Sequence, residues 1–234
     1  MIAKKERKKS SMKLAAVNKA RYLAIIELDE LNIKGTVRLS DCVAPIAERY
    51  KFDVFPQNAE DFDLENKGVK FESGKDGDLT IDSLVLYNGA IYVDTFASTA
   101  DSQRILVEML EWGSKTFGLS YSEGMIRKCA YISQVLFYTD FPLLVEASPA
   151  LKKLAQKTSS ITEGLFGGLV YEPLNLSVGH DPMARKHGIA SFYIQHRINT
   201  LFAENKYFSE APLPTDQHIK FLEEFEADVL ESLK

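Results

Sequence analysis

Cysteine is scarce in this chain of 234 residues, which contains only Cys42 and Cys129. A secreted domain of this size that depended on disulfides would usually have more of them. The chain has no Cys-x-x-Cys pair either, so the common structural zinc sites are not expected. We interpret both cysteines as small, buried apolar side chains in a protein of the cytosol.

Long apolar runs are also missing. No segment approaches the roughly 18 consecutive apolar residues of a membrane span. Lys13, Lys19 and Arg21 interrupt any apolar stretch that would act as a secretory signal near the N-terminus. The sequence therefore predicts a cytoplasmic protein with no membrane attachment. Its composition, 45% hydrophobic and 26% charged, is that of an ordinary globular protein.

Motifs of the best-known catalytic sites are absent as well. There is no Gly-x-Ser-x-Gly nucleophile elbow. The glycine-rich segment 164–168 leads into residues that we interpret as a strand, so it lacks the helix N-terminus that binds phosphate in nucleotide-binding folds. We predict no cofactor, and the lack of a dense catalytic motif favours a non-catalytic role.

What the chain does contain is a clear hairpin followed by a helix. The two predicted strands, 82–87 and 90–94, flank Asn88-Gly89, a favoured pair for a type I′ turn. Ser98 is a candidate N-cap, with Asp101 three residues later, for a helix that continues to Phe117. This order predicts an antiparallel sheet with a helix packed on it.

The second half shows a similar plan. Residues 130–138 are rich in aromatic and β-branched side chains and predict a buried strand. Ser148 and Pro149 predict the start of a helix that places Leu151 and Leu154 on its inner face. Two further strands are expected at 165–178 and 189–201, and Thr215 is expected to cap a last amphipathic helix.

These elements predict an α+β fold, with a mixed, mostly antiparallel sheet or sheets and amphipathic helices packed on one face. We expect a basic, flexible N-terminal arm over 1–21. Two sub-domains are expected after it: 22–120, which contains the hairpin, and 121–234, which ends in the amphipathic helix.

Charge is distributed unevenly along the chain. Residues 1–21 contain eight basic side chains and one acidic one, whereas the rest of the chain is acidic. A basic arm can bind nucleic acid by releasing counterions. Because the acidic remainder would repel a phosphate backbone, we favour a solvated tail and keep nucleic-acid binding as the weaker alternative.

His180, Asp181 and His187 are the only weak candidates for catalysis. Imidazole and carboxylate groups can transfer protons or hold a divalent metal, as in a metal-dependent hydrolase or nuclease. Their spacing, however, matches neither the i, i+2 pattern of a strand nor the i, i+4 pattern of a helix. His196 is expected on the apolar face of its strand.

An acidic loop partly follows the calcium-binding pattern. Its candidate oxygen ligands are Asp61, Asp63, Glu65 and Glu72. Asn66 stands where that pattern requires glycine, and the flanking residues predict strands instead of helices. We therefore favour a solvated acidic loop and predict no metal site.

The most suggestive surface lies between residues 191 and 208. Alternation in the predicted strand separates an apolar face from a polar and aromatic one. Aromatic and arginine side chains beside a loop are typical of interfaces. The candidate binding residues are Tyr193, Gln195, Arg197, Asn199, Lys206 and Tyr207. The alternative is that Tyr207 and Phe208 belong to the core.

Two functions remain open at this point. We favour a non-catalytic interaction or assembly subunit, a homodimer or part of a larger complex, whose partner is another protein or a second copy. The alternative is the hydrolase or nuclease-like enzyme that uses His180, Asp181 and His187.

Overall fold

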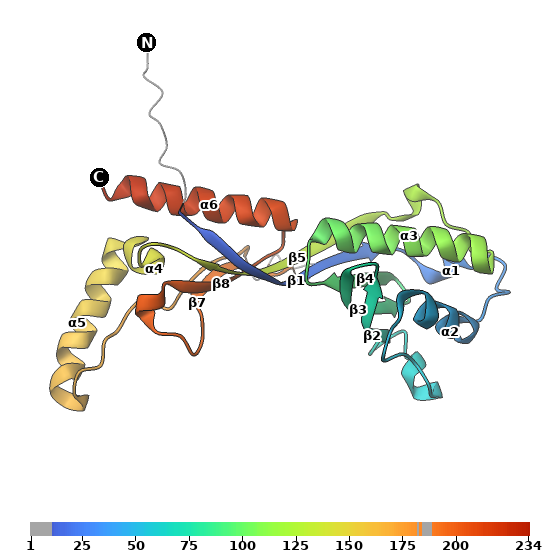
Figure 1. Ribbon diagram of the computed structural model, residues 1–234, viewed down its shortest axis with the longest axis horizontal. Helices are drawn as coiled ribbons and strands as arrows, with labels where there is room; N and C mark the ends of the chain where they lie inside the picture. The colour runs from blue at the N-terminus through green and yellow to red at the C-terminus, as the bar shows by residue number, and fades with distance from the viewer. Residues whose placement is uncertain (1–10, 182, 184–188) are drawn as a thin grey trace, which may run out of the picture. The chain divides into compact units, whose positions relative to one another are not determined.

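The computed structural model describes residues 11–181, 183 and 189–234 and shows the predicted α+β fold (Figure 1). In this part of the chain, eight strands form one antiparallel sheet in the order β2-β3-β4-β1-β5-β8-β7-β6. The strands are β1 (Lys13–Ile25), β2 (Val69–Asp76), β3 (Leu79–Tyr87), β4 (Ala90–Thr95), β5 (Lys128–Tyr138), β6 (Asn175–Val178), β7 (Phe192–His196) and β8 (Lys206–Ala211).

Helices occur between the strands and at the C-terminus. They are α1 (Leu28–Leu31), α2 (Leu39–Tyr50), α3 (Thr99–Phe117), α4 (Leu143–Glu146), α5 (Pro149–Phe166) and α6 (Thr215–Ser232). Short 3-10 turns are η1 (Ala59–Phe62), η2 (Glu123–Met125) and η4 (Phe202–Glu204).

Two compact units can be distinguished by their internal contacts. The α2–α3 unit consists of 17–133 and 213–215, and the α5–α6 unit contains the described residues of 1–16, 134–212 and 216–234. The boundaries 16/17 and 133/134 lie inside β1 and β5.

The predicted hairpin and the helix after it are confirmed. β3 and β4 pair antiparallel with Tyr87 opposite Ala90, so that Asn88 and Gly89 form the turn. Ser98 caps α3: its hydroxyl accepts a hydrogen bond from the backbone N–H of Asp101, 3.1 Å away. Local sequence alone specifies this part of the fold.

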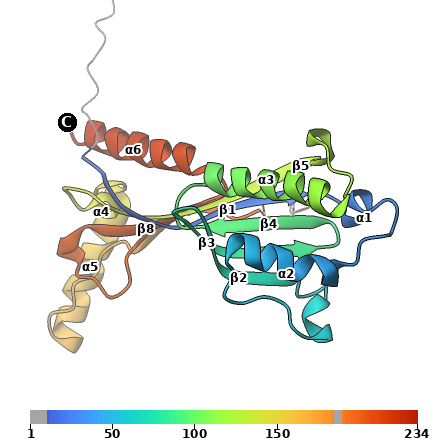
Figure 2. The ribbon, with the colours of Figure 1, turned by 45° about the vertical axis from the view of Figure 1, so that its right-hand side comes forward.

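Helices α2 and α3 cover the same face of their part of the sheet (Figure 2). Alternate strand residues such as Leu84 and Val93 are buried beneath them, together with Leu106 of α3. Trp112 of α3 contacts Tyr50 of α2 edge to face, with ring centroids 6.5 Å apart. The helices are therefore packed against each other as well as on the sheet.

The core of the α5–α6 unit forms around β8. The ring of Tyr207 lies 5.5 Å from that of Phe137 in β5, and Ile194 of β7 is also buried. Leu222 and Val229, on the inner face of α6, are buried as well. The last amphipathic helix is thus confirmed.

Two segments differ from the expectations. Residues 13–21, expected in the arm, belong to β1. Helix α5 continues to Phe166, where a strand was predicted, and only 175–178 of that segment is a strand. Hydroxyl groups of α5, such as Thr158 and Ser159, bond to carbonyls four residues earlier, and Gly167 ends the helix at a positive φ of 72°.

Candidate interaction surface

Helix α5 carries a stripe of apolar side chains that are exposed instead of packed. Leu154, Ile161 and Leu165 are 61%, 68% and 69% exposed, and Leu151 is 41% exposed. The prediction that Leu151 and Leu154 face inward is therefore wrong. Together with Thr158, these residues follow the alternating three- and four-residue spacing of a coiled-coil seam.

The side of α5 that faces its own unit is small and polar instead. Ala155 and Ser159 are half-buried there. The Ser159 hydroxyl accepts a hydrogen bond of 2.9 Å from the backbone N–H of Tyr171, and Lys152 forms an ion pair with Glu146 at 2.6 Å. An amphipathic helix that serves only its own core has the reverse arrangement.

The segment after α5 extends this apolar surface. It runs back alongside the helix (Figure 1), and its apolar side chains are exposed as well. Among the described residues, β6 then pairs with β7 on one side only and forms an edge of the sheet. We name the exposed apolar residues the α5 surface: Leu151, Leu154, Ile161, Leu165, Leu169, Val170 and Leu174.

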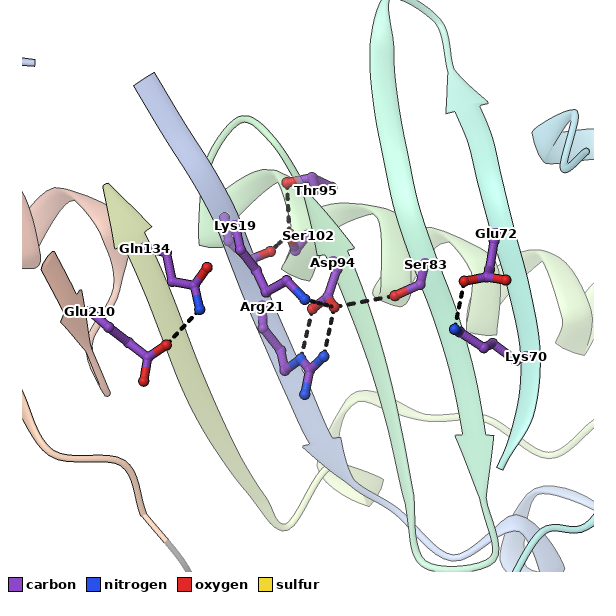
Figure 3. Close-up of polar contacts among 11 residues, drawn as sticks. Lys19, Arg21, Lys70, Glu72, Ser83, Asp94, Thr95, Ser102, Gln134 and Glu210 are labelled. Carbon is purple, nitrogen blue, oxygen red and sulfur yellow. Dashed lines mark hydrogen bonds and ion pairs between the residues drawn. The ribbon is translucent and has the colours of Figure 1, made fainter. Parts of the chain in front are cut away.

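A second cluster lies on the face of the α2–α3 unit opposite its helices (Figure 3). Arg21 donates hydrogen bonds of 2.7 Å to both carboxylate oxygens of Asp94, whose side chain is 1% exposed. Lys19 and Ser83 contact the same carboxylate at 3.3 and 3.2 Å. The guanidinium also stacks 3.8 Å from the ring centre of Tyr92.

This cluster holds strands together and offers little chemistry. Burial alone would lower the pKa of Arg21, but hydrogen bonds and charge attraction from Asp94 raise it above its ordinary value. Both oxygens of Asp94 are occupied, so the carboxylate is not available as a base or a metal ligand. Lys19 and Arg21, on which the nucleic-acid prediction partly rests, are bound to Asp94.

The predicted binding residues of β7 and β8 lie partly on one half-buried face. Tyr193, Gln195 and Lys206 are each half-buried. The ring of Tyr193 lies 5.9 Å from that of Phe208, and the Lys206 ammonium lies 5.1 Å from the ring centre of Tyr138. Tyr193 and Lys206 thus each contact an aromatic ring of the same chain.

The remaining predicted binding residues are placed differently. Arg197 is half-buried, and Asn199 is exposed in a turn with a positive φ of 62°. Tyr207 is 2% exposed and Phe208 8% exposed. Both side chains therefore lie in the core, which was the alternative to a role in binding.

The structure describes two of the three predicted catalytic residues, His180 and Asp181, and the side chain of each contacts backbone groups. The exposed His180 ring is 3.1 Å from the carbonyl oxygen of Asp181, and the Asp181 carboxylate accepts a hydrogen bond from the backbone N–H of Met183. His187 lies outside the described residues. His196 is half-buried and packs edge to face on Phe202.

The acidic loop is stabilised by its own backbone. The Asp61 carboxylate accepts hydrogen bonds from two backbone N–H groups, and so does that of Asp63, which lowers the pKa of both. Glu72 lies on β2 and forms an ion pair with Lys70 (Figure 3). Glu65 contributes its backbone N–H to the turn.

Sequence reasoning missed a buried polar pair in the α5–α6 unit. His218 of α6 is fully buried, and its Nε2 lies 2.8 Å from the hydroxyl of Ser209. That hydroxyl donates to the carbonyl of Tyr193, so the histidine donates to Ser209. Burial lowers the pKa of His218 to about 4. The signal was present in the helical spacing, because His218 lies four residues before the core residue Leu222.

Across the described ranges, no three His, Cys, Asp or Glu side chains converge in a way that would hold a metal ion. None of the described helices is long and apolar enough to cross a bilayer. No protein-family model matches this chain, and no curated protein matches it significantly. Among the described residues, the α5 surface is therefore the best candidate for a functional site.

Proposed function

We propose that this protein is a non-catalytic assembly subunit that pairs with a second copy of itself through the α5 surface. The observation that carries the proposal is the reversed polarity of α5, with leucine and isoleucine exposed and small polar residues facing the chain. Leaving such a stripe exposed to water costs about 25 cal/mol of free energy for each Å² of apolar area that a partner could cover. A contiguous apolar patch of this kind is typical of a protein interface.

The pattern along α5 supports a second copy as the partner. A two-fold interface requires a surface that is complementary to itself. If two α5 helices pair antiparallel about Thr158, Leu151 meets Leu165 of the second copy, and Leu154 lies beside its Ile161. The stripe of one copy would thus be covered by the same stripe of the second copy, and no other partner would be needed.

The flanks of the stripe are consistent with close helix pairing. Ala150 and Gly164, on the exposed flank, are small and uncharged, so that two helix backbones can approach. Lys157 is the single charged residue at the positions that flank the stripe in the heptad pattern. The stripe therefore does not require a partner of opposite charge.

The experiment is to measure the mass in solution by size-exclusion chromatography with light scattering. We expect the wild-type chain to have the mass of two chains. Ile161→Glu and Leu165→Glu should each raise the dissociation constant of the dimer by about tenfold or more, because a carboxylate would be buried in an apolar interface. Ile33→Glu is the matched control, since Ile33 is also exposed but belongs to the α2–α3 unit. A monomeric wild-type chain would rule the proposal out.

We also infer a cytoplasmic location. Its support is the pair of cysteines, both of which carry free thiols: Cys42 is buried and Cys129 exposed. An exposed free thiol persists most easily in a reducing compartment.

A further inference from the structure

The α2–α3 unit contains an apolar cavity of about 200 Å³, partly open to solvent, that the proposed assembly role does not use. Helix α3 and the strands behind it contribute buried residues, among them Leu106, Leu110 and Ile91. Trp112 and Cys42 add side chains from α3 and α2. All of these residues belong to a single unit.

The interior of the cavity offers almost no polar partner. Asp29 is the one charged residue of its lining, and its side chain is exposed. The Asn32 amide is already engaged, because it donates to the Val37 carbonyl at 2.8 Å and accepts from the Val37 N–H at 3.3 Å. Water that enters the apolar interior would find few of the two to four hydrogen-bond partners it needs there.

The thiol of Cys42 adds no charged group to the lining of the cavity. Its Sγ lies 3.7 Å from the carbonyl oxygen of Arg38 and donates to it. Burial raises the pKa of this thiol to about 11, so the group stays neutral. Apart from the carboxylate of Asp29, the space is therefore lined by uncharged groups.

The size of the cavity is sufficient for a ligand. An apolar cavity of roughly 150 Å³ stays dry and binds benzene. Protein interiors are otherwise packed to the density of organic crystals, and an unfilled space forfeits dispersion contacts along its whole lining. A molecule that filled this space would restore them.

We propose that this cavity binds a small apolar molecule whose single polar end is neutral or cationic. The apolar part would lie against Leu106, Leu110 and Trp112, and the polar end beside Asp29. A carboxylate in that position would be repelled by the Asp29 carboxylate, whereas an amine would be attracted. The ligand class is thus an aliphatic or aromatic alcohol or amine, and not a fatty acid.

The test uses three probes of equal chain length: n-octanol, n-octylamine and octanoate. Trp112 is the only tryptophan of the chain and lines the cavity, so its fluorescence reports binding directly. We expect saturable changes and a raised melting temperature with the alcohol and the amine, and affinity about tenfold lower for octanoate. Asp29→Asn should reduce the difference between amine and carboxylate and leave octanol binding unchanged.

Variants at the lining locate the binding. Cys42→Phe and Leu39→Phe should fill the cavity and abolish binding, whereas Cys42→Ala, the matched control, should retain it. Leu39 is half-buried, so Leu39→Phe decides the question if Cys42→Phe does not fold. Ile161→Glu should bind the probes like the wild type, which separates this proposal from the dimer. No response of Trp112 to any probe, or undiminished binding by Leu39→Phe, would overturn it.

Discussion

Arg21 and Asp94 lie directly opposite each other on the neighbouring strands β1 and β4 and form a doubly hydrogen-bonded ion pair. The carboxylate is almost fully buried although it lies on the face of the sheet opposite the helices. Lys19, two residues earlier on β1, contacts the same group. β1 contains Lys13, Lys19 and Arg21, the basic residues of 11–21, and it is therefore held in place by an acidic side chain far along the chain.

We predict that Asp94→Asn lowers the free energy of unfolding by about 3 kcal/mol or more, because it leaves the partly buried Arg21 without its counter-charge. Urea unfolding followed by circular dichroism measures this. Asp76→Asn is the control: it removes an ion pair with Arg104 that is more exposed and is expected to cost less than about 1 kcal/mol. Equal losses for the two variants would contradict the structural role of Asp94.

The buried His218 predicts a loss of stability in weak acid. Its pKa is about 4 in the folded chain and about 6.5 when unfolded, so the unfolded chain binds the proton first as the pH falls. The free energy of unfolding should therefore fall between about pH 6.5 and pH 4, by about 3 kcal/mol from this group. His218→Gln keeps a donor for Ser209 and should lose this part of the pH dependence. His180→Gln, at an exposed histidine, should behave like the wild type.

The two cysteines should differ sharply in reactivity. The prediction that both are buried is confirmed for Cys42 and wrong for Cys129, which is exposed. Burial raises the pKa of the Cys42 thiol to about 11. An aromatic disulfide reagent at pH 8 should therefore modify one thiol rapidly and the other only as the protein unfolds. Cys129→Ser should remove the rapid phase. A rapid phase that survives in this variant would show that the α2 region opens readily.

The cap of α3 gives a simpler prediction. Ser98→Ala removes the acceptor of the Asp101 N–H and should cost about 1 kcal/mol of stability. Thermal or urea denaturation measures the loss. Ser122→Ala, at the start of the short turn η2, serves as a comparison for a serine that begins no long helix. The larger loss is expected at Ser98.

The parts of the fold that could be predicted are those with local signals. The Asn88-Gly89 turn, the Ser98 and Ser148 caps and the strand at 130–138 each depend on neighbouring residues, and the structure confirms them. β1 was missed because Lys19 and Arg21 suggest a solvated arm. Their partner, Asp94, comes 73 residues after Arg21, and no local pattern connects them.

The α5 surface could not be predicted for a related reason. The spacing of Leu151 and Leu154 predicts an amphipathic helix, and the structure shows one. Periodicity, however, does not reveal whether an apolar stripe faces the chain's own core or a second chain. Similarly, Leu169 and Val170 were expected in a strand, but they are exposed and belong to no strand of the sheet.

Cross-linking between copies tests the dimer most directly. In a Cys129→Ser background, Thr158→Cys places a thiol on the two-fold axis of the antiparallel pair, where it should oxidise rapidly to a disulfide-linked dimer. Leu151→Cys lies on the same stripe, but antiparallel pairing separates the two copies of this position by roughly 21 Å, too far to cross-link. Rapid dimer formation by Thr158→Cys alone is the predicted result. Equal cross-linking of both variants, or of neither, would contradict the account.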